Sequence, residues 1–392
     1  MTDFDHDVLI AGAGPAGSHA AYLLARAGMR VALLDRARFP RDKVCGGGLS
    51  AKTLTLLETA PGPVVHKTFT GAWIAWRGQR AFAKDLGRPV GCTVARSEFD
   101  HWLVLRAQAA GAQFHPESAV RGVTQGARCT QIDTERGVFR ARIVLAADGV
   151  ASTLRAQLFG RRAVAVAPAV EALVYCSEER LQRFGERVLF DLGGMPRGYG
   201  WIFPKRDHLN AGVYSIFGGT GIRKHLQAFL RCHGLPADER NVCVRGHAIP
   251  VRNALHSYQR GSVWLLGDAA GFAEAVYGEG IYFALKSARL AASVVLEAGG
   301  SPAPGEYDRR VRTELEPELR WSQRVGRALF SIGPLAFDPL ARSRLACDWF
   351  AALITGDLSY RACFWRAVGA SPAWLLSRRH ALRPGSEWHP AL

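Results

Sequence analysis

Several features that define other classes of protein are absent from this chain of 392 residues. Its 8 cysteines lie far apart, without a Cys-x-x-Cys pair or a histidine at metal-binding spacing, so neither a metal site nor a disulfide framework is expected. No window of about 18 residues is both apolar and uncharged, because Asp268, Glu274 and Glu279 interrupt the most apolar segment. The sequence therefore predicts no membrane-spanning helix, while attachment to a membrane surface stays open.

A signal-peptide pattern and a hydrolytic triad are also missing. An apolar segment starts at Val8, which leaves no room for charged and apolar leader regions, and we therefore expect a cytoplasmic protein. His101, His208 and His247 have no partner arrangement that marks a general base, and no Ser-His-Asp arrangement is recognisable. Hydrolytic chemistry accordingly has no support.

Lysine is scarce, and the positive charge of the chain comes from arginine. There are 50 basic and 34 acidic residues, a formal net charge of +16, yet only 7 of the basic residues are lysines. The basic residues are scattered, without a block of five or six, so a compositional bias toward arginine explains much of the excess. Nucleic acid is not expected as a partner, whereas phosphates and acidic lipid headgroups remain the alternative explanation of the charge.

The length suits two interleaved domains, and the apolar periodicity indicates an α/β fold. Residues 7–11, 15–28 and 30–34 are typical of a strand, a helix and a strand, the unit from which Rossmann-like sheets are built. Later segments of the same character extend this sheet: strands at 143–147 and 263–266, and helices at 97–110 and 279–298.

The predicted domains are discontinuous. The dinucleotide domain is expected to comprise residues 1–162 and 253–303, with an inserted segment at about 55–95 that belongs to the substrate side. Short β-rich segments broken by glycines predict a substrate domain over 163–252, and apolar helical periodicity predicts a C-terminal helical region over 304–392.

A glycine-rich segment, Gly12–Gly17 with the sequence GAGPAG, lies between the first strand and the first helix. A pyrophosphate in this position approaches bare backbone N–H groups and the positive end of the helix. Asp35 follows 18 residues after Gly17, at the end of the second strand, where a carboxylate accepts hydrogen bonds from ribose hydroxyls. The combination predicts a dinucleotide site, the alternative being a glycine-rich turn with an incidental aspartate.

Two distant segments favour FAD over a nicotinamide dinucleotide as the bound cofactor. The segment 263–271 places Asp268 just after a strand, where its carboxylate would bind the ribityl chain or approach the pyrophosphate. Gly278, Gly280 and Ile281 then open a helix whose N-terminus would stabilise negative charge on the reduced flavin ring.

Together with the segment Leu145–Gly149 (LAADG), these residues resemble the flavoproteins that include aromatic hydroxylases and, within them, the geranylgeranyl reductase family. Three further segments are similar to the reductase branch: Lys43–Gly48 (KVCGGG), Pro196–Pro204 (PRGYGWIFP, with the family's Tyr-x-Trp-x-Phe-Pro motif) and Leu353–Arg361 (LITGDLSYR). The resemblance covers most of the chain. It implies a Rossmann-like FAD-binding domain, an interleaved β-sheet substrate domain and a C-terminal helical cap.

The motifs and the resemblance together give the expected site residues. Cys45, Tyr199 and Trp201 are the candidates on the catalytic side. The expected FAD contacts are Gly12, Gly14, Pro15, Ala16, Gly17, Asp35, Arg36, Cys45, Gly46, Arg96, Val120, Asp148, Gly149, Gly267, Asp268, Gly278, Gly280 and Ile281.

Structural alternatives accompany these assignments. Arg96 would otherwise be a solvated surface charge, Cys45 a small residue packed against the flavin, and Trp201 an ordinary core residue. One departure concerns the segment after the Gly-Asp pair, where the family often has proline and this chain has Glu274–Tyr277. A loop of different shape, and with it a different substrate preference, is expected there.

The resemblance implies a reductase that saturates C=C bonds of a geranylgeranyl or other prenyl chain, with FAD as cofactor and NADPH or NADH as electron donor. The alternative is an FAD-dependent monooxygenase or halogenase acting on an aromatic or lipophilic substrate. A halogenase would carry Trp-x-Trp-x-Ile-Pro in place of the Tyr-x-Trp-x-Phe-Pro motif, together with a suitably placed lysine. A lipophilic substrate and a basic chain also predict peripheral contact with an anionic membrane.

Overall fold

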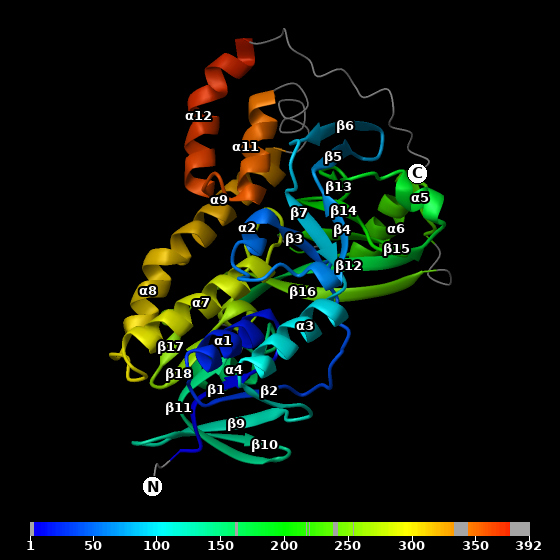
Figure 1. Ribbon diagram of the computed structural model, residues 1–392. Helices are drawn as coiled ribbons and strands as arrows, with labels where there is room; N and C mark the ends of the chain where they lie inside the picture. The colour runs from blue at the N-terminus through cyan, green and yellow to red at the C-terminus, as the bar shows by residue number, and fades with distance from the viewer. Residues whose placement is uncertain are drawn as a thin grey trace. The chain divides into compact units, whose positions relative to one another are not determined.

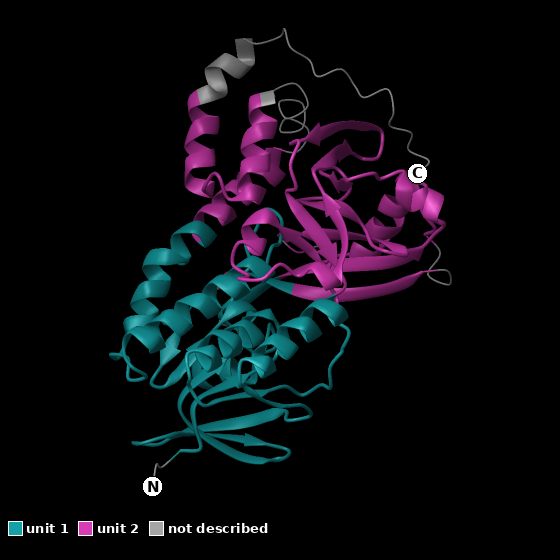
Figure 2. Ribbon diagram, viewed as in Figure 1, with its two compact units in different colours: residues 1–43, 96–166, 249–319 teal, residues 44–95, 167–248, 320–392 magenta. Residues whose placement is uncertain are grey.

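The computed structural model describes residues 4–160, 164–216, 218, 220–237, 242–253, 255–332 and 344–376. Its chain divides into two compact units, each assembled from three separate stretches (Figures 1 and 2). Unit 1 comprises residues 1–43, 96–166 and 249–319, and unit 2 comprises residues 44–95, 167–248 and 320–392. Residues 304–319 of the predicted C-terminal region thus group with unit 1 and the later ones with unit 2, while residues 377–392 lie outside the described part of the chain.

Unit 1 contains a mixed sheet of eight strands whose centre is parallel. The central strands β1 (His6–Ala11), β2 (Val31–Leu34) and β11 (Gly137–Ala146) pair in parallel, with Val8 opposite both Val31 and Ile143. Their apolar runs are buried on both faces, as parallel strands covered by helices require. The remaining strands are β8 (Gln113–His115), β9 (Val120–Gln125), β10 (Thr130–Thr134), β17 (Gln259–Arg260) and β18 (Val263–Leu265).

Three helices of unit 1 pack against one another beside this sheet. Helix α1 (Pro15–Arg26) contacts both α3 (Arg96–Ala109) and α7 (Ile281–Glu297). Proline at the first position of α1 suits a helix start, since its missing N–H would have no partner there. The predicted strands and helices of this unit are confirmed within two residues, except that β11 begins at Gly137, six residues before the predicted start. Two shorter helices complete the unit: α4 (Thr153–Phe159) and α8 (Glu306–Glu314).

Unit 2 is built on a seven-stranded sheet in the order β16-β12-β15-β14-β13-β5-β6. Its strands are β16 (Cys243–Asn253), β12 (Val164–Tyr175), β15 (His208–Ser215), β14 (Gly198–Pro204), β13 (Arg187–Asp191), β5 (Gly71–Trp76) and β6 (Arg80–Asp85). A smaller sheet consists of β3 (Gly48–Ser50), β7 (Gly91–Val94) and β4 (Val65–Phe69). Five of the seven strands come from the predicted β-rich segment, and β5 and β6 come from the inserted segment predicted to belong to the substrate side.

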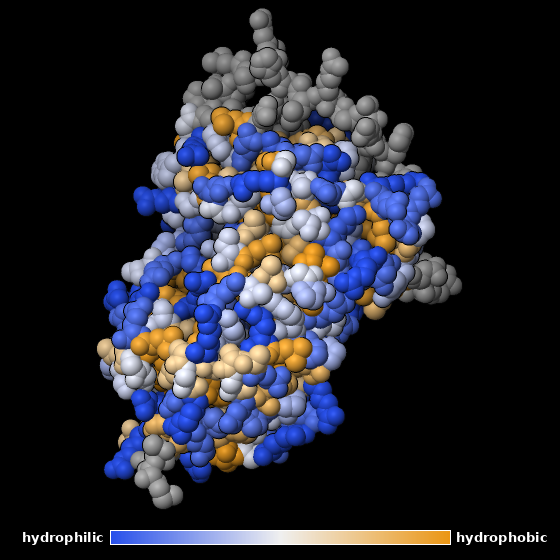
Figure 3. Space-filling view, in the orientation of Figure 1, coloured by the Kyte–Doolittle hydropathy of each residue, from blue (hydrophilic) through white to orange (hydrophobic). Residues whose placement is uncertain are grey.

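Helices of unit 2 include a C-terminal pair, α11 (Arg344–Thr355) and α12 (Tyr360–Leu376), which contact each other (Figure 1). The others are α2 (Ala51–Leu54), α5 (Glu178–Gln182), α6 (Ile222–Cys232) and α9 (Glu316–Ile332), whose first residues belong to unit 1. None of the described helices is long and apolar enough to cross a membrane. On the face drawn in Figure 3, hydrophilic side chains are widespread and hydrophobic ones form scattered patches.

Candidate functional site

The loop after β1 in unit 1 is so tight that two of its glycines cannot be replaced. Gly12 has φ +98°, and a Cβ there would lie 2.4 Å from the carbonyl oxygen of Ala147. A Cβ on Gly17 would lie 1.8 Å from the carbonyl oxygen of Gly12. Gly14, by contrast, faces open space, with Arg41 Nη2 as its nearest neighbour at 3.8 Å. No side chain caps the first turn of α1, so its amides are available to an anion.

Asp35 lies directly after β2 and is hydrogen-bonded to this loop. Its Oδ2 accepts from the amide of Ala13 at 2.7 Å, and its Oδ1 accepts from the amide of Ala37 at 2.9 Å. The carboxylate is 8% exposed, so these bonds hold the end of β2 against the glycine loop. Each oxygen keeps a further lone pair for a ribose hydroxyl. Arg36, the neighbouring residue, is exposed.

Asp148 and Gly149 follow β11, next to the same loop. Asp148 Oδ2 accepts from the amides of Thr153 at 2.8 Å and Leu154 at 3.4 Å, so it caps the start of α4. Its Oδ1 is buried and has no hydrogen-bond partner among the described residues. Burial raises the pKa of this carboxyl group. One oxygen of the predicted cofactor aspartate therefore stabilises the start of α4, and the other can still accept a hydrogen bond.

Arg96 is not the solvated surface charge that sequence alone left open. Its guanidinium donates to Asp100 through Nε at 2.7 Å and Nη2 at 2.8 Å, and its side chain is 8% exposed. Arg41 Nη2 lies 3.2 Å from the same fully buried carboxylate. Asp100 therefore fixes two cations, one of which is the neighbour of Gly14. Arg41 Nη1 is buried without a hydrogen-bond partner in the described part of the chain.

The segment after β18 brings Asp268 next to the start of α7. Gly267 adopts φ +52°, and its amide donates to Ser287 Oγ at 3.0 Å. A Cβ on Gly280 would lie 3.2 Å from Asp268 Oδ1, so the glycine before Ile281 keeps the carboxylate close to the helix. Burial raises the pKa of Asp268, while the charges of Lys43, Arg96 and Arg155 oppose this shift.

The loop that departs from the family pattern is organised by a buried glutamate. Glu274 accepts hydrogen bonds from the amides of Val276 and Tyr277, both at 2.7 Å, and of Glu279 at 3.0 Å. One carboxylate therefore does the shaping that a proline residue would do through its fixed φ angle. The loop includes Gly278, which has φ +66° and leads into α7.

Val120, another predicted cofactor contact, begins β9 in unit 1. It is half-buried, pairs with Thr134 of β10 and packs against the core of that unit. Its predicted contact with the cofactor stays a prediction.

In unit 2 the Tyr-x-Trp-x-Phe-Pro motif forms β14 and presents a row of aromatic rings. Tyr199 and Trp201 lie with ring centroids 6.1 Å apart, and Trp201 and Phe203 lie 6.5 Å apart, as alternate residues on one face of a strand should. Phe190 on β13 contacts both Tyr199 and Phe203. Trp201 Nε1 donates to Asn210 at 2.8 Å, and Asn210 in turn donates to the buried Glu171 at 3.0 Å.

The cysteine-glycine segment lies against this aromatic row. A Cβ on Gly46 would be 3.1 Å from Trp201 Nε1, and one on Gly48 would be 2.9 Å from the ring of Phe203. Cys45 is half-buried, and its Sγ accepts from the amide of Gly47 at 3.4 Å. Two of the three segments that carried the resemblance to the reductase branch are therefore in direct contact within unit 2.

Lys205, which sequence reasoning passed over, holds the cysteine-glycine segment. Its side chain is buried, and Nζ donates to the carbonyl oxygens of Gly46 at 2.7 Å, Gly47 at 3.3 Å and Val94 at 2.8 Å. Burial lowers its pKa to about 8. A signal was present in the sequence: one of only seven lysines directly follows the Phe-Pro of the motif.

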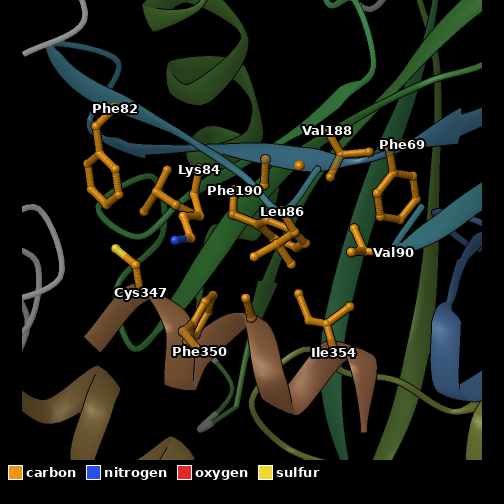
Figure 4. Close-up of a pocket in the computed structure, with 14 residues that line it drawn as sticks. Phe69, Phe82, Lys84, Leu86, Val90, Val188, Phe190, Cys347, Phe350 and Ile354 are labelled. Carbon is orange, nitrogen blue, oxygen red and sulfur yellow. The ribbon is translucent and has the colours of Figure 1, made fainter. Parts of the chain in front are cut away.

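Unit 2 also contains a small apolar pocket of about 40 Å³ between its large sheet and helix α11. Figure 4 shows Phe350 and Ile354 of α11 pointing toward Phe190 and Leu86. Among the described residues that line it, Lys84 alone is charged, and its Nζ is paired with the carboxylate of Asp348 at 2.5 Å. The pocket therefore offers a hydrocarbon surface with its charge already neutralised.

The comparison with known proteins assigns this chain to a family. Residues 5–164 match the family model of an FAD binding domain. The chain is 31% identical to digeranylgeranylglycerophospholipid reductase 1 of Methanopyrus kandleri, over 75% of this chain and 81% of the relative. It is 30% identical to geranylgeranyl diphosphate reductase of Rhodobacter capsulatus, over 76% and 77%.

The fold agrees with this assignment. A geranylgeranyl bacteriochlorophyll reductase-like protein of Thermoplasma acidophilum matches with a TM-score of 0.76 and 22% identity, over 93% of this chain and 98% of that one. The predicted fold class is confirmed. The site residues suit a dinucleotide such as FAD. The tight glycine loop and the uncapped N-terminus of α1 leave backbone amides for phosphate, and Asp148 Oδ1 and Arg41 Nη1 are buried without a hydrogen-bond partner among the described residues. The chain belongs to the geranylgeranyl reductase family of FAD-dependent oxidoreductases.

Proposed function

We propose that this FAD-dependent oxidoreductase saturates C=C bonds of a prenyl chain. The observation that carries the proposal is the apolar pocket of unit 2, whose lining is hydrocarbon except for the thiol of Cys347 and the paired Lys84. A branched hydrocarbon chain has no hydrogen bonds to satisfy, so a pocket of this kind binds it through burial of apolar surface. The relatives named geranylgeranyl reductases support a chain of that class.

Residues of unit 1 would hold the cofactor. The amides of Gly12–Gly17 and the start of α1 would bind the pyrophosphate, Asp35 the ribose, and Asp268 with the N-terminus of α7 the flavin half. Arg41 and Arg96, both fixed by Asp100, place positive charge next to this set. When bound and reduced, FAD supplies the electron pair that saturates the alkene.

Residues of unit 2 would orient the alkene and exclude water from it. The aromatic row of Tyr199, Trp201 and Phe203 provides an apolar surface of tilted rings, and Phe190 connects that row to the lining of the pocket. The hydrogen bond from Trp201 to Asn210 fixes the tilt of the indole ring and so makes the aromatic row rigid. Alignment of this kind accelerates a reaction without any side chain entering it chemically.

An anaerobic assay tests the proposal. Protein loaded with FAD and reduced with dithionite is incubated with geranylgeranyl diphosphate or a digeranylgeranyl phospholipid, and the products are weighed by mass spectrometry. We expect the mass to rise by two hydrogens for each saturated bond. A product that forms only when oxygen is admitted would contradict the proposal and support monooxygenase or halogenase chemistry instead.

We also propose NADPH or NADH as the donor that reduces the flavin. Anaerobic titration with each nucleotide, followed through the flavin absorbance, distinguishes the two. Bleaching by dithionite but by neither nucleotide would exclude both and leave a protein donor such as a ferredoxin.

The pocket is tested by filling it. Ala351 lines the pocket from α11, and the substitution Ala351→Trp should slow reduction of a geranylgeranyl chain more than that of a geranyl chain, because only the longer chain reaches the obstruction. Leu345→Trp is the matched control, since Leu345 is 51% exposed on the same helix and is not among the lining residues. Equal slowing of both chain lengths would remove the pocket from the substrate path.

We further propose peripheral contact with an anionic membrane through helices α11 and α12. Trp365 and Val368 are 56% and 47% exposed on α12, beside the exposed Arg361 and Arg366. Exposed tryptophan with flanking arginine suits the interface of a lipid bilayer. Sedimentation with anionic vesicles should therefore exceed that with neutral ones and fall in Trp365→Ser, while Tyr175→Ser, which removes another exposed ring, should have no effect. Binding that ignores both lipid charge and Trp365 would overturn this.

A further inference from the structure

The side chain of Lys205 is a buried cation with backbone oxygens, not a carboxylate, as its direct acceptors. It is 5% exposed and donates to three carbonyl oxygens, those of Gly46, Gly47 and Val94. An ammonium group has three N–H donors, so these three bonds use all of them. Two of the acceptors belong to the cysteine-glycine segment and the third to β7.

Lys205 shares the task of holding the segment with β7. The Gly47 carbonyl oxygen also accepts from the Val94 amide at 2.8 Å, and Gly48 pairs with Thr93, whereas the donor to the Gly46 carbonyl oxygen is Lys205, at 2.7 Å. Gly47 has φ +65°, and a Cβ there would lie 2.2 Å from the Val94 carbonyl oxygen and 2.8 Å from Lys205 Nζ. The backbone is therefore pressed against the ammonium with no space for a side chain. Lys205 itself is fixed by its amide, which donates to the His208 carbonyl oxygen at 2.8 Å in the turn between β14 and β15.

We infer that Lys205 is a positioning residue for the reaction: its ammonium group holds the Cys45–Gly48 loop in place, and loss of its proton at alkaline pH releases the loop. This inference rests on the proposed function, because the loop matters to the reaction only if it faces the flavin. The family's cysteine-glycine segment is already linked to the flavin by resemblance, whereas the lysine that fixes it is a further residue.

The electrostatic surroundings of Lys205 support a change of charge in an accessible pH range. Burial lowers its pKa from 10.5 to about 8, and electrostatic interaction with Cys45 in the loop and Glu171 on β12 opposes this shift. Burial raises the pKa of Cys92 on β7 to about 11, so that thiol stays neutral while the lysine titrates. The neutral amine keeps two N–H donors for three carbonyl acceptors, so one of these three carbonyl oxygens loses its bond to the lysine.

Hydrogen-deuterium exchange of the apoprotein measures the loop without relying on turnover. Protection factors, corrected for intrinsic exchange, are compared at about pH 7 and about pH 9.5 for peptides covering residues 44–50 and 91–95. We expect protection in the wild type to fall on the order of tenfold across this range, and in Lys205→Met to be low at both pH values. Lys67→Met is the matched control, because Lys67 Nζ also donates to a backbone carbonyl, that of Leu181 at 3.4 Å.

Turnover then decides whether the loop matters for the reaction. In the wild type, kcat should fall above about pH 8 in parallel with the loss of protection, and Lys205→Arg, which stays charged, should move this fall to higher pH. Protection that is unchanged by Lys205→Met or by pH overturns the inference. Loss of protection with an unchanged pH profile also overturns it, since the lysine would then be structural only. A wild type that reduces no prenyl substrate would refute the proposed function. The exchange data would still show whether Lys205 holds the Cys45–Gly48 loop.

Discussion

The candidate residues of the two units are built in different ways. In unit 1 the predicted cofactor residues consist mainly of backbone: the glycine loop, the uncapped start of α1 and the start of α7. In unit 2 the proposed substrate residues are side chains that support one another, with Trp201 bonded to Asn210 and Lys205 bonded to loop carbonyls. A backbone site requires particular glycines at fixed spacing, whereas a side-chain site requires partners that are distant in sequence.

This difference explains why substitutions should act differently in the two units. In unit 1 the critical changes are those that add an atom where the backbone has no room. In unit 2 they are those that remove a hydrogen-bond partner or a charge from a packed surface. The four substitutions that follow test this contrast.

The largest effect is expected from Gly17→Ala in unit 1. The new methyl group would lie 1.8 Å from the Gly12 carbonyl oxygen, so the loop must move away from α1. Purified protein should contain no bound FAD, measured as the ratio of flavin to protein absorbance. Gly14→Ala is the control for sterics, because its nearest neighbour would be 3.8 Å away and the fold should survive. Normal FAD content in Gly17→Ala would show that the loop is more adaptable than a backbone cradle.

The glycine positions illustrate what the sequence could reveal. Gly12, Gly17 and Asp35 were recognisable because a pyrophosphate and a ribose impose fixed spacing on one continuous strand-helix-strand segment. The predicted strands and helices of unit 1 were recognisable for a similar reason, since apolar periodicity is a local property, whereas for unit 2 it gave only the β-rich and helical character of long segments. Local patterns thus specify the fold class well.

The supporting residues could not be identified in the same way. Asp100 appeared only as a polar position on a helix, yet it is fully buried between Arg41 and Arg96. Lys205 and Glu171 act on partners more than thirty residues away in the chain. Nothing local distinguishes a polar residue on the surface from one buried with a distant partner, because tertiary packing decides between them. Scarcity was the one usable clue, and it applied to the lysine alone.

The next largest effect is expected from Asp100→Asn. The amide keeps the shape but removes the fully buried carboxylate with which both Arg41 and Arg96 are paired, and removing one member of a buried ion pair costs about 3–5 kcal/mol. The melting temperature and the affinity for FAD should both fall. Asp348→Asn in unit 2 is the matched control, because Asp348 is 47% exposed and its pair with Lys84 should contribute only about 0–1 kcal/mol. Equal losses in the two variants would contradict the special status of Asp100.

A smaller effect is expected from Lys205, whose contribution to the free energy of unfolding should become more favourable as the pH rises. Burial lowers its pKa from 10.5 to about 8, so between these values the unfolded chain holds a proton that the folded chain has released. Stability rises with pH wherever the unfolded state binds more protons. The buried ammonium therefore destabilises the fold fully below about pH 8, and this destabilisation disappears as the pH approaches 10.5. The relief amounts to on the order of 3 kcal/mol across the whole window.

The measurement is the difference in melting temperature between wild type and Lys205→Met. This difference should become more favourable to the wild type as pH rises from about 7.5 to about 9.5, since methionine does not titrate. Over the same range the cysteine-glycine loop should lose protection, because one carbonyl loses its donor. Global stability and local order would thus move in opposite directions, and a difference in melting temperature that is flat with pH would show that Lys205 does not titrate in this range.

The smallest effect compares one tryptophan from each unit. Trp201 in unit 2 donates through Nε1 to Asn210 at 2.8 Å, whereas Nε1 of the buried Trp264 in unit 1 has no hydrogen-bond partner among the described residues. Trp264 is instead stacked on Tyr307, with ring centroids 4.9 Å apart. Both Trp→Phe substitutions remove the same volume, but only Trp201→Phe leaves a buried acceptor unsatisfied, at a cost of about 1–3 kcal/mol.

Trp201→Phe should therefore lower the melting temperature more than Trp264→Phe, while FAD content stays normal in both variants. Its effect on turnover should appear mainly in kcat, because a ring free to tilt aligns the alkene less well. If Trp264→Phe is the more damaging of the two, packing volume outweighs hydrogen bonding in both units. The contrast between the backbone-built residues of unit 1 and the side-chain-built residues of unit 2 would then hold for the glycines and the buried charges alone.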